Sequence, residues 1–323
     1  MNSKNLLFVL LLPFTLLVSC KQKDEAATPL YAEHDVMVQL VQTNTTNFTT
    51  AAKSIFTDLL SDSLERAEFC QIFTHQARFM NDKSGYVFVE TESGYNIAHP
   101  FHVELEGTNT LEQTDANGNF IVQKMIETIK NIGYGFLVYD YLNPTSNRAE
   151  HKTTFVGRIE NSGWYSGSGF YHPNNNKLFN QTDKNKLIVK EAATFMAEGI
   201  GAVLSALTTD SLEGVEMMRS LLKHVRFFEN QSGYFFVIDF KGYNVVQPPD
   251  PSIQGTYEWD IQDVKGNYLV RDLVFAARQG GGYVSYYWKD YQTNEDKLKT
   301  AFAIQIPGKD YLIGSGVYLP DGY

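Results

Sequence analysis

The sequence predicts an α+β protein built from two copies of one module, each a long N-terminal helix packed on an antiparallel sheet of about five strands. Residues 79–100 and 227–248 reveal the duplication, because ten of their 22 positions are identical at a constant offset of 148. Ordinary residue usage gives roughly one or two such matches. Inside each copy, a helical stretch, two strands, a second helix and three strands follow in the same order.

The first element of each copy is a long helical stretch, at residues 36–79 and 185–228. Apolar residues fall on one face at helical spacing in the second copy, and these are Ile188, Ala192, Phe195, Met196, Ile200 and Val203. The segment 208–210 interrupts this stretch, so we expect Asp210 or Ser211 to cap a second helix.

Strands follow the helices. Residues 85–89 and 233–237 are aromatic and β-branched, which predicts a first strand in each copy. Gly94 and Gly242 fit a turn into a second strand. The other elements expected in the first copy are a turn at 115–118, a short helix ending near Gly133, and strands at 136–141, 152–159 and 164–171.

The repeat also predicts the domain boundaries. After Gly133 the offset becomes 147, and it pairs residues 167–169 with residues 314–316, both Gly-Ser-Gly. An asparagine-rich connector follows the first copy. We therefore expect one module at 31–173 and the second at 174–323.

The N-terminus predicts export and lipidation. An apolar run from Leu6 to Val18 is too short for a membrane-spanning helix, and it ends in Leu-Val-Ser-Cys, which resembles the lipobox of bacterial lipoprotein precursors. We expect a signal peptide and lipobox at 1–20, lipid on Cys20, and a polar tether at 21–30. An ordinary secretory signal is the alternative for the leader, and a plain linker is the alternative to a surface-export tether. The predicted location is the bacterial cell envelope, anchored to the outer membrane on its periplasmic face or on the cell surface.

Charge limits the partners. Without residues 1–19, which contain only Lys4 as a charged residue, the protein has 26 basic and 37 acidic residues. A net charge of −11 argues against nucleic acid and against an anionic membrane surface, so the lipid is the expected membrane contact. Cys70 remains as the other cysteine, and we expect a small buried hydrophobe on a helix.

Several motifs in one order resemble the Cache sensory family, most closely its subgroup of two related modules. They are GYFFVIDFKGYNVVQPP from Gly233, Asp263 with Gly266, the segment 282–289, Lys299-Thr-Ala-Phe, and Gly314-Ser-Gly-Val-Tyr318. The resemblance covers nearly all of residues 31–323. It implies a PAS-like sheet behind a long helix, and binding of small extracytoplasmic ligands, often short carboxylates or amino acids, for chemoreceptors and sensor kinases.

The sequence departs from that pattern at defined positions. His99-Pro100 becomes Gln247-Pro248 in the second copy, and Thr91 stands where the second copy has Asp239. These exchanges leave open that one pocket has lost its ligand. Members of the family usually continue into a transmembrane helix and a signalling domain, which this chain lacks, so we expect output through a partner protein.

A small anion bound by an acidic protein needs local positive charge and hydroxyl donors in an apolar cup. Lys152 and Lys299 each open a strand beside a tyrosine, and an arginine ends the helical stretch of each copy. The family pattern adds further donors. The candidate ligand-binding residues are Arg78, Tyr86, His99, Tyr139, Lys152, Arg226, Tyr234, Tyr286, Trp288 and Lys299.

Each candidate has a structural alternative. A lysine at a strand start is commonly solvated, and the arginines equally fit a salt bridge that anchors the helix. Tyr171 and Tyr318 fit core or strand-end positions. The two Gly-Ser-Gly motifs fit tight strand geometry better than a phosphate loop, since no helix follows them.

Catalysis has little support in the sequence. His99 and His102 have no matching carboxylate and no counterpart in the second copy, so they form a weak metal pair. No serine sits in a nucleophile elbow, and Gly280-Gly281-Gly282 lacks dinucleotide spacing. We expect no catalytic residue, metal or cofactor. The predicted function is a ligand-binding lipoprotein of sensory type; the alternative is an interaction lipoprotein that retains the fold without a ligand.

Overall fold

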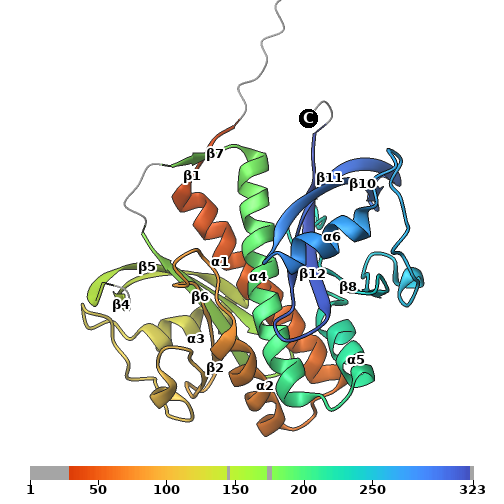
Figure 1. Cartoon of the computed structure of the whole chain (residues 1–323). Coiled ribbons are helices and arrows are strands. Elements are labelled where there is room, and N and C mark those ends of the chain that lie inside the picture. Colours follow the sequence, from red (N-terminus) through yellow and green to blue (C-terminus); the bar gives the residue numbers. More distant parts are fainter. Residues whose placement is uncertain (1–28, 144–145, 173–176, 321–323) are drawn as a thin grey trace, which may run out of the picture.

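The computed structural model describes residues 29–143, 146–172 and 177–320 (Figure 1). Its first module contains β1 (Tyr31–Ala32), α1 (Glu33–Asp58), α2 (Ser63–Gln76), β2 (Val87–Thr91), β3 (Asn96–Ala98), a 3₁₀ turn (Val103–Leu105), α3 (Ile121–Ile132), β4 (Tyr134–Asn143), β5 (Arg148–Ile159) and β6 (Trp164–Tyr171). The second contains β7 (Leu178–Phe179), α4 (Gln181–Leu207), α5 (Ser211–Leu222), β8 (Phe236–Asp239), β9 (Asn244–Val246), a 3₁₀ turn (Pro251–Ile253), α6 (Leu269–Arg278), β10 (Gly282–Asp290), β11 (Glu295–Gln305) and β12 (Tyr311–Tyr318). The predicted α+β class with two modules is confirmed.

Each module has an antiparallel five-stranded sheet, and the two sheets have the same topology. The strand orders are β3-β2-β6-β5-β4 and β9-β8-β12-β11-β10. The last strand of each module therefore lies in the middle of its sheet, beside the first. The short strands β1 and β7 pair with each other and join the start of α1 to the start of α4.

Local sequence signals set the helix ends. Asp62 and Glu65 form a capping box at the start of α2, and Asp210 accepts hydrogen bonds from two backbone N–H groups at the start of α5. The predicted cap at Asp210 is thus confirmed. Gly133 ends α3 in a left-handed conformation, with φ of 88°, which glycine adopts without steric cost.

The long helical stretches end earlier than predicted. Helices α2 and α5 stop at Gln76 and Leu222, and the first strands begin at Val87 and Phe236. Between them the backbone turns through left-handed positions at Met80 and Phe228, which a continuing helix cannot contain. The apolar pattern of the sequence continues across this turn, because Phe79 and Phe227 in the turn are buried like the apolar residues of the helices.

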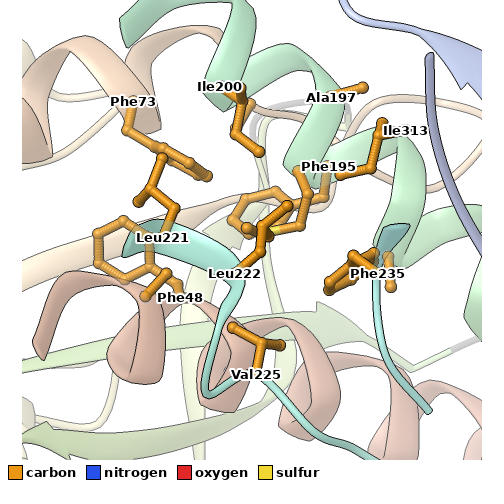
Figure 2. Packing of buried hydrophobic residues seen from close by; sticks show 14 of the residues in the cluster. Phe48, Phe73, Phe195, Ala197, Ile200, Leu221, Leu222, Val225, Phe235 and Ile313 are labelled. Carbon is orange, nitrogen blue, oxygen red and sulfur yellow. The ribbon is translucent and has the colours of Figure 1, made fainter. Parts of the chain in front are cut away.

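One hydrophobic core joins the two modules. Helices α1 and α4 pack against each other, α2 packs on α4, and α5 packs on α1 (Figure 1). Figure 2 shows Phe48 of α1, Phe73 of α2 and Phe195 of α4 in this core with Leu221 and Leu222 of α5. Cys70 is also buried there, as predicted. Each sheet presents one face to this core, and a smaller cluster under α3 or α6 covers its other face.

Candidate ligand-binding sites

A row of three side chains crosses the sheet of each module on the face under α3 or α6. In the first module, Tyr139 on β4, Lys152 on β5 and Tyr171 on β6 are direct cross-strand partners. The second module has the same row, formed by Tyr286, Lys299 and Tyr318. Residues that pair directly across strands point to the same face of a sheet. Register therefore places each lysine between two tyrosines.

Both lysines are almost fully buried, with 1% of each side chain exposed. The Nζ of Lys152 donates a hydrogen bond to the hydroxyl of Tyr86 at 2.8 Å, and Lys299 donates to Tyr234 at the same distance. Neither ammonium forms an ion pair within residues 29–143, 146–172 and 177–320. The alternative of solvated lysines is therefore wrong.

Aromatic rings surround the ammonium groups of Lys152 and Lys299. The Nζ of Lys152 lies 4.6 Å from the ring centre of Tyr86, 5.2 Å from Tyr141 and 5.3 Å from Tyr171. Such cation–π contacts recover part of the lost hydration. Burial still lowers the pKa of both Lys152 and Lys299 to about 7.

The Gly-Ser-Gly motifs make room for this arrangement. A Cβ atom at Gly169 would lie 2.8 Å from the Cε of Lys152, and one at Gly316 would lie 2.8 Å from the Cε of Lys299. The first glycine of each motif similarly accommodates the ring of Phe88 or Phe236. The Oγ1 of Thr154 and the carbonyl oxygen of Thr300 would lie closer still to these Cβ atoms. Tight strand geometry therefore explains the glycines, through the neighbouring strand together with the lysine stem.

The exchanged pair His99 and Gln247 occupies corresponding places in the two sites, and both side chains line the small cavity of their module. The Nδ1 of His99 accepts a hydrogen bond from the backbone N–H of His102 at 3.1 Å. Burial, together with nearby Lys152, lowers the pKa of His99 to about 3, so the ring is neutral. We infer that Nε2 carries the proton. Gln247 donates through Nε2 to the hydroxyl of Tyr291, so both positions supply an N–H donor.

A buried carboxyl group also lines each cavity, at different positions in the two modules. Glu90 on β2 accepts hydrogen bonds from Asn96, Thr110 and the hydroxyl of Tyr165. Burial raises the pKa of Glu90 despite these bonds.

In the second module, Glu258 stands at the position of Thr110 and accepts hydrogen bonds from Asn244 and Thr256. Burial raises the pKa of Glu258 too. Ile238 and Leu312 there replace the cross-strand pair Glu90 and Tyr165. The buried carboxyl group is therefore on strand β2 in the first module and in the segment after β9 in the second.

The space between these side chains is small, with cavities of about 20 Å³ in each module. A water molecule needs roughly 10–15 Å³ of this kind of volume. Each site therefore has room for about one water molecule, and an organic ligand would have to displace the surrounding side chains.

Two family matches cover the chain. Residues 36–191 match the family described as Cache domain (dCache_2), and residues 180–323 match Single Cache domain 2 (sCache_2). The chain belongs to the Cache family, with two Cache domains in tandem. The resemblance stated from the motifs is confirmed. Cache domains are extracytoplasmic, which is compatible with a place in the cell envelope.

Curated relatives are sensory proteins. Over 146 residues, 43% of this chain, the sequence is 28% identical to the sensor histidine kinase MctS of Rhizobium johnstonii. Over 143 residues, 44% of the chain, it is 27% identical to the methyl-accepting chemotaxis protein McpP of Pseudomonas putida. The matches span 31% and 26% of the lengths of these relatives.

Similar solved structures include domains of chemotaxis proteins and a Cache chemosensory domain. A methyl-accepting chemotaxis protein from Vibrio parahaemolyticus has 26% identity and a TM-score of 0.34, covering 39% of this chain and 85% of that one. A periplasmic sensor domain of a chemotaxis protein has 27% identity and a TM-score of 0.37, covering 40% and 90%. A Cache chemosensory domain described for carboxylic acid recognition has 23% identity and a TM-score of 0.35, covering 38% and 86%.

The arginines lie outside the linings of the two Cache cavities. The guanidinium of Arg78 donates to the carbonyls of Thr74 and Ala77 and stacks 5.0 Å from the ring centre of Phe101. Arg226 donates to the carbonyls of Val225 and Lys223 in the same way. Both side chains therefore hold the end of a helix through backbone carbonyls. A ligand contact for Arg78 or Arg226 stays a prediction.

Of the other candidates, Tyr86, His99, Tyr139 and Lys152 line the first cavity, and Tyr234, Tyr286 and Trp288 line the second. Lys299 is not part of the second lining, but it donates a hydrogen bond to Tyr234, which is.

The cavities also contain residues that the sequence reasoning missed. Trp288 lines the second cavity, and its counterpart Tyr141 lines the first. Tyr141 lies two residues after Tyr139, and that spacing alone places both on one face of β4. Glu90 was detectable as the charged residue of the buried strand β2. Tyr171 and Tyr318 end their strands as expected, but their rings also face the lysines.

Proposed function

We propose that this protein binds small carboxylates in its Cache modules, with Lys152 and Lys299 as the anion-binding groups. The observation that supports this proposal is the pair of buried ammonium groups that form no close ion pair among the described residues, Asp290 acting on Lys299 only from a longer distance. Burying an unpaired charge is costly, whereas a carboxylate within hydrogen-bond reach would offset that cost. Retention of the same arrangement in both modules supports a role beyond packing.

The donors around each lysine suit a carboxylate. Because Lys152 donates to the oxygen of Tyr86, the hydroxyl proton of Tyr86 remains available to the ligand. The Nε2–H of His99 supplies another donor at the same cavity. In the second module, Tyr234 and Gln247 have these roles.

The small size of the two cavities limits the size of the proposed ligand. Sites of about 20 Å³ favour monocarboxylates of two to four carbons, which require the smallest displacement of side chains. Amino acids are the second class, since Glu90 and Glu258 could accept a ligand ammonium in their ionised form. The narrow cavities also favour the competing function, a Cache protein that keeps the fold without a ligand.

Thermal-shift and calorimetric titrations with acetate, propionate, pyruvate, glycine and alanine would test the proposal. We expect at least one carboxylate to raise the melting temperature and to bind the wild type. The double variant Lys152→Met and Lys299→Met should fold and should not respond. Absence of any response in the wild type would support the ligand-free function instead.

The cell-envelope role is a proposal as well. Residues 1–28 lie outside the described residues, so lipidation at Cys20 rests on the sequence. In the part of the chain that the structure describes, each helix is too short or too polar to cross a membrane. We propose a lipid-anchored Cache protein that reports ligand binding to a separate signalling protein. Incorporation of a labelled fatty acid, lost in Cys20→Ala, would test the anchor.

A further inference from the structure

The loops after α2 and α5 share one backbone conformation. Met80 and Phe228 occupy corresponding positions and both have left-handed angles, with φ of 67° and 64°. Lys83 and Gln231 also correspond, with left-handed φ angles of 58° and 57°. In each loop an antiparallel bridge joins a phenylalanine to a glycine six residues later. Backbone N–H groups at corresponding positions therefore point in corresponding directions.

In the first module this loop binds carboxylates from the other module. Glu198 on α4 accepts a hydrogen bond from the N–H of Arg78 at 2.7 Å. Glu191, one helical heptad earlier, accepts from the N–H of Met80 at 2.6 Å. Two backbone donors of the loop are thus satisfied by two side-chain carboxylates.

The second module has the loop without its carboxylates. The facing helix there is α1, which has Thr43 and Thr50 at the offset of 148 from the glutamates. This offset also relates the first residues of the two helices. Among the described residues, the N–H groups of Arg226 and Phe228 have no hydrogen-bond partner. The donor pair is the same, but nothing on α1 reaches it.

A groove of about 880 Å³ lies against this loop, and Thr43, at the position of Glu191, lines it. Thr50, at the position of Glu198, lines a neighbouring pocket instead. The loop from 226 to 232 forms one wall, and Gln42, Thr43 and Thr46 of α1 lie opposite. Its volume falls in the range of small-molecule sites. The groove shares no lining residue with the two Cache cavities, although it is lined by Tyr318, whose ring faces Lys299.

The charges that line this groove are compatible with binding of an anion. Lys184 and Arg226 contribute two cations to its lining, and Glu229 and Asp290 contribute two anions. The carboxylate of Asp290 is already paired with Lys297 at 2.9 Å. Glu229 is exposed, so solvent screens its charge.

We propose that this groove is an additional ligand site that takes a small dicarboxylate, with one carboxylate on the N–H of Arg226 and the other on that of Phe228. Backbone nitrogens two residues apart are separated by at most about 7 Å, which a dicarboxylate of roughly four to six carbons spans. The first module supports this proposal, because there two carboxylates accept hydrogen bonds from the corresponding pair of N–H donors. Lys184 adds a cation on the α4 side.

Calorimetric titration with succinate, glutarate and adipate tests the site. We expect binding by the wild type and equal binding by the double variant Lys152→Met and Lys299→Met, which removes only the Cache-cavity ammonium groups. Thr43→Glu places a carboxylate where α4 has Glu191, so it should weaken dicarboxylate binding at least tenfold. Thr57→Glu adds the same charge to α1 outside the groove and should bind like the wild type.

Amide resonances give a second measurement that needs no variant. In the wild type, the N–H signals of Arg226 and Phe228 should move downfield on titration with the bound dicarboxylate, and those of Arg78 and Met80 should not. Failure of all three acids to bind, loss of binding in the lysine double variant, or unchanged amide signals would overturn the proposal. These outcomes are independent of acetate or propionate binding in the Cache cavities.

Discussion

The two modules keep the same cation and differ in almost everything that surrounds it. A tyrosine–lysine–tyrosine row crosses both sheets, and a glycine in each makes room for the lysine stem. Around this row, His99 is exchanged for Gln247, and the buried carboxyl moves from Glu90 to Glu258. The proposed carboxylate would therefore meet the same cation in both modules, but different side chains around it.

Replacing one lysine at a time should have the largest effect. Lys152→Met should strongly weaken carboxylate binding in the first module and leave the second unaffected, and Lys299→Met should do the reverse. A charge-assisted hydrogen bond contributes about 1.5–3 kcal/mol, which corresponds to roughly ten- to 150-fold in affinity. Single-site calorimetry of both variants measures this. Equal weakening of both sites by one variant would contradict independent pockets.

The same variants should fold at least as stably as the wild type without ligand. Methionine fills much of the volume of the lysine stem and removes a buried charge that has no counter-ion. Chemical denaturation would measure the free energy of unfolding. A loss above about 3 kcal/mol would mean that the ammonium stabilises the fold and is no ligand group.

Adding a methyl group beside each lysine should have the next largest effect on stability and binding. Gly169→Ala and Gly316→Ala place a Cβ 2.8 Å from the lysine Cε, so we expect a loss of about 1–3 kcal/mol of stability and a displaced ammonium. Gly157→Ala is the matched control, because its Cβ would meet its nearest neighbours at 3.7 Å. Thermal unfolding and acetate titration of the three variants distinguish steric displacement from a general loss of strand structure.

Both sites should share one pH dependence. The ligand-free lysines have a pKa of about 7, and a bound carboxylate raises it, so binding takes up a proton above that pH. Affinity should therefore fall as pH rises above 7, by up to about tenfold per pH unit. Calorimetry in buffers of different ionisation enthalpy measures the uptake. Proton release, or constant affinity from pH 7 to 9, would disprove the assignment.

Stability of the ligand-free protein should change with pH in the opposite direction. An unfolded lysine keeps its proton up to about pH 10.4, whereas the folded Lys152 and Lys299 lose theirs near 7. Because the unfolded chain binds more protons in this window, unfolding free energy rises with pH across it. The lysine double variant should show a smaller rise in denaturant titrations.

Exchanging the residues that differ should have the smallest effect. His99→Gln and Gln247→His each retain an N–H donor at the cavity, so carboxylate affinity should change less than about threefold. His99→Leu removes the donor and should weaken binding more, by roughly 1 kcal/mol. A large effect of the conservative exchange would show that the imidazole itself selects the ligand.

The sequence by itself determined the duplication, the order of elements and much of the site. Fixed offsets paired Lys152 with Lys299, Tyr86 with Tyr234, and Tyr139 with Tyr286. Turn glycines and the cap at Asp210 were readable because they depend on nearby residues alone. The helix ends at residues 76 and 222 were not, since buried phenylalanines continued the apolar pattern.

Only the tertiary structure decided which polar groups are paired. Burial of the lysines, the buried Glu90 beside Tyr165, and the carbonyl contacts of Arg78 depend on strands and helices that are distant in sequence. The closed loop of the first module and the open groove of the second likewise depend on which helix faces each loop. Periodicity records the face on which a residue lies, whereas its partner is set by packing between elements, which no local pattern contains.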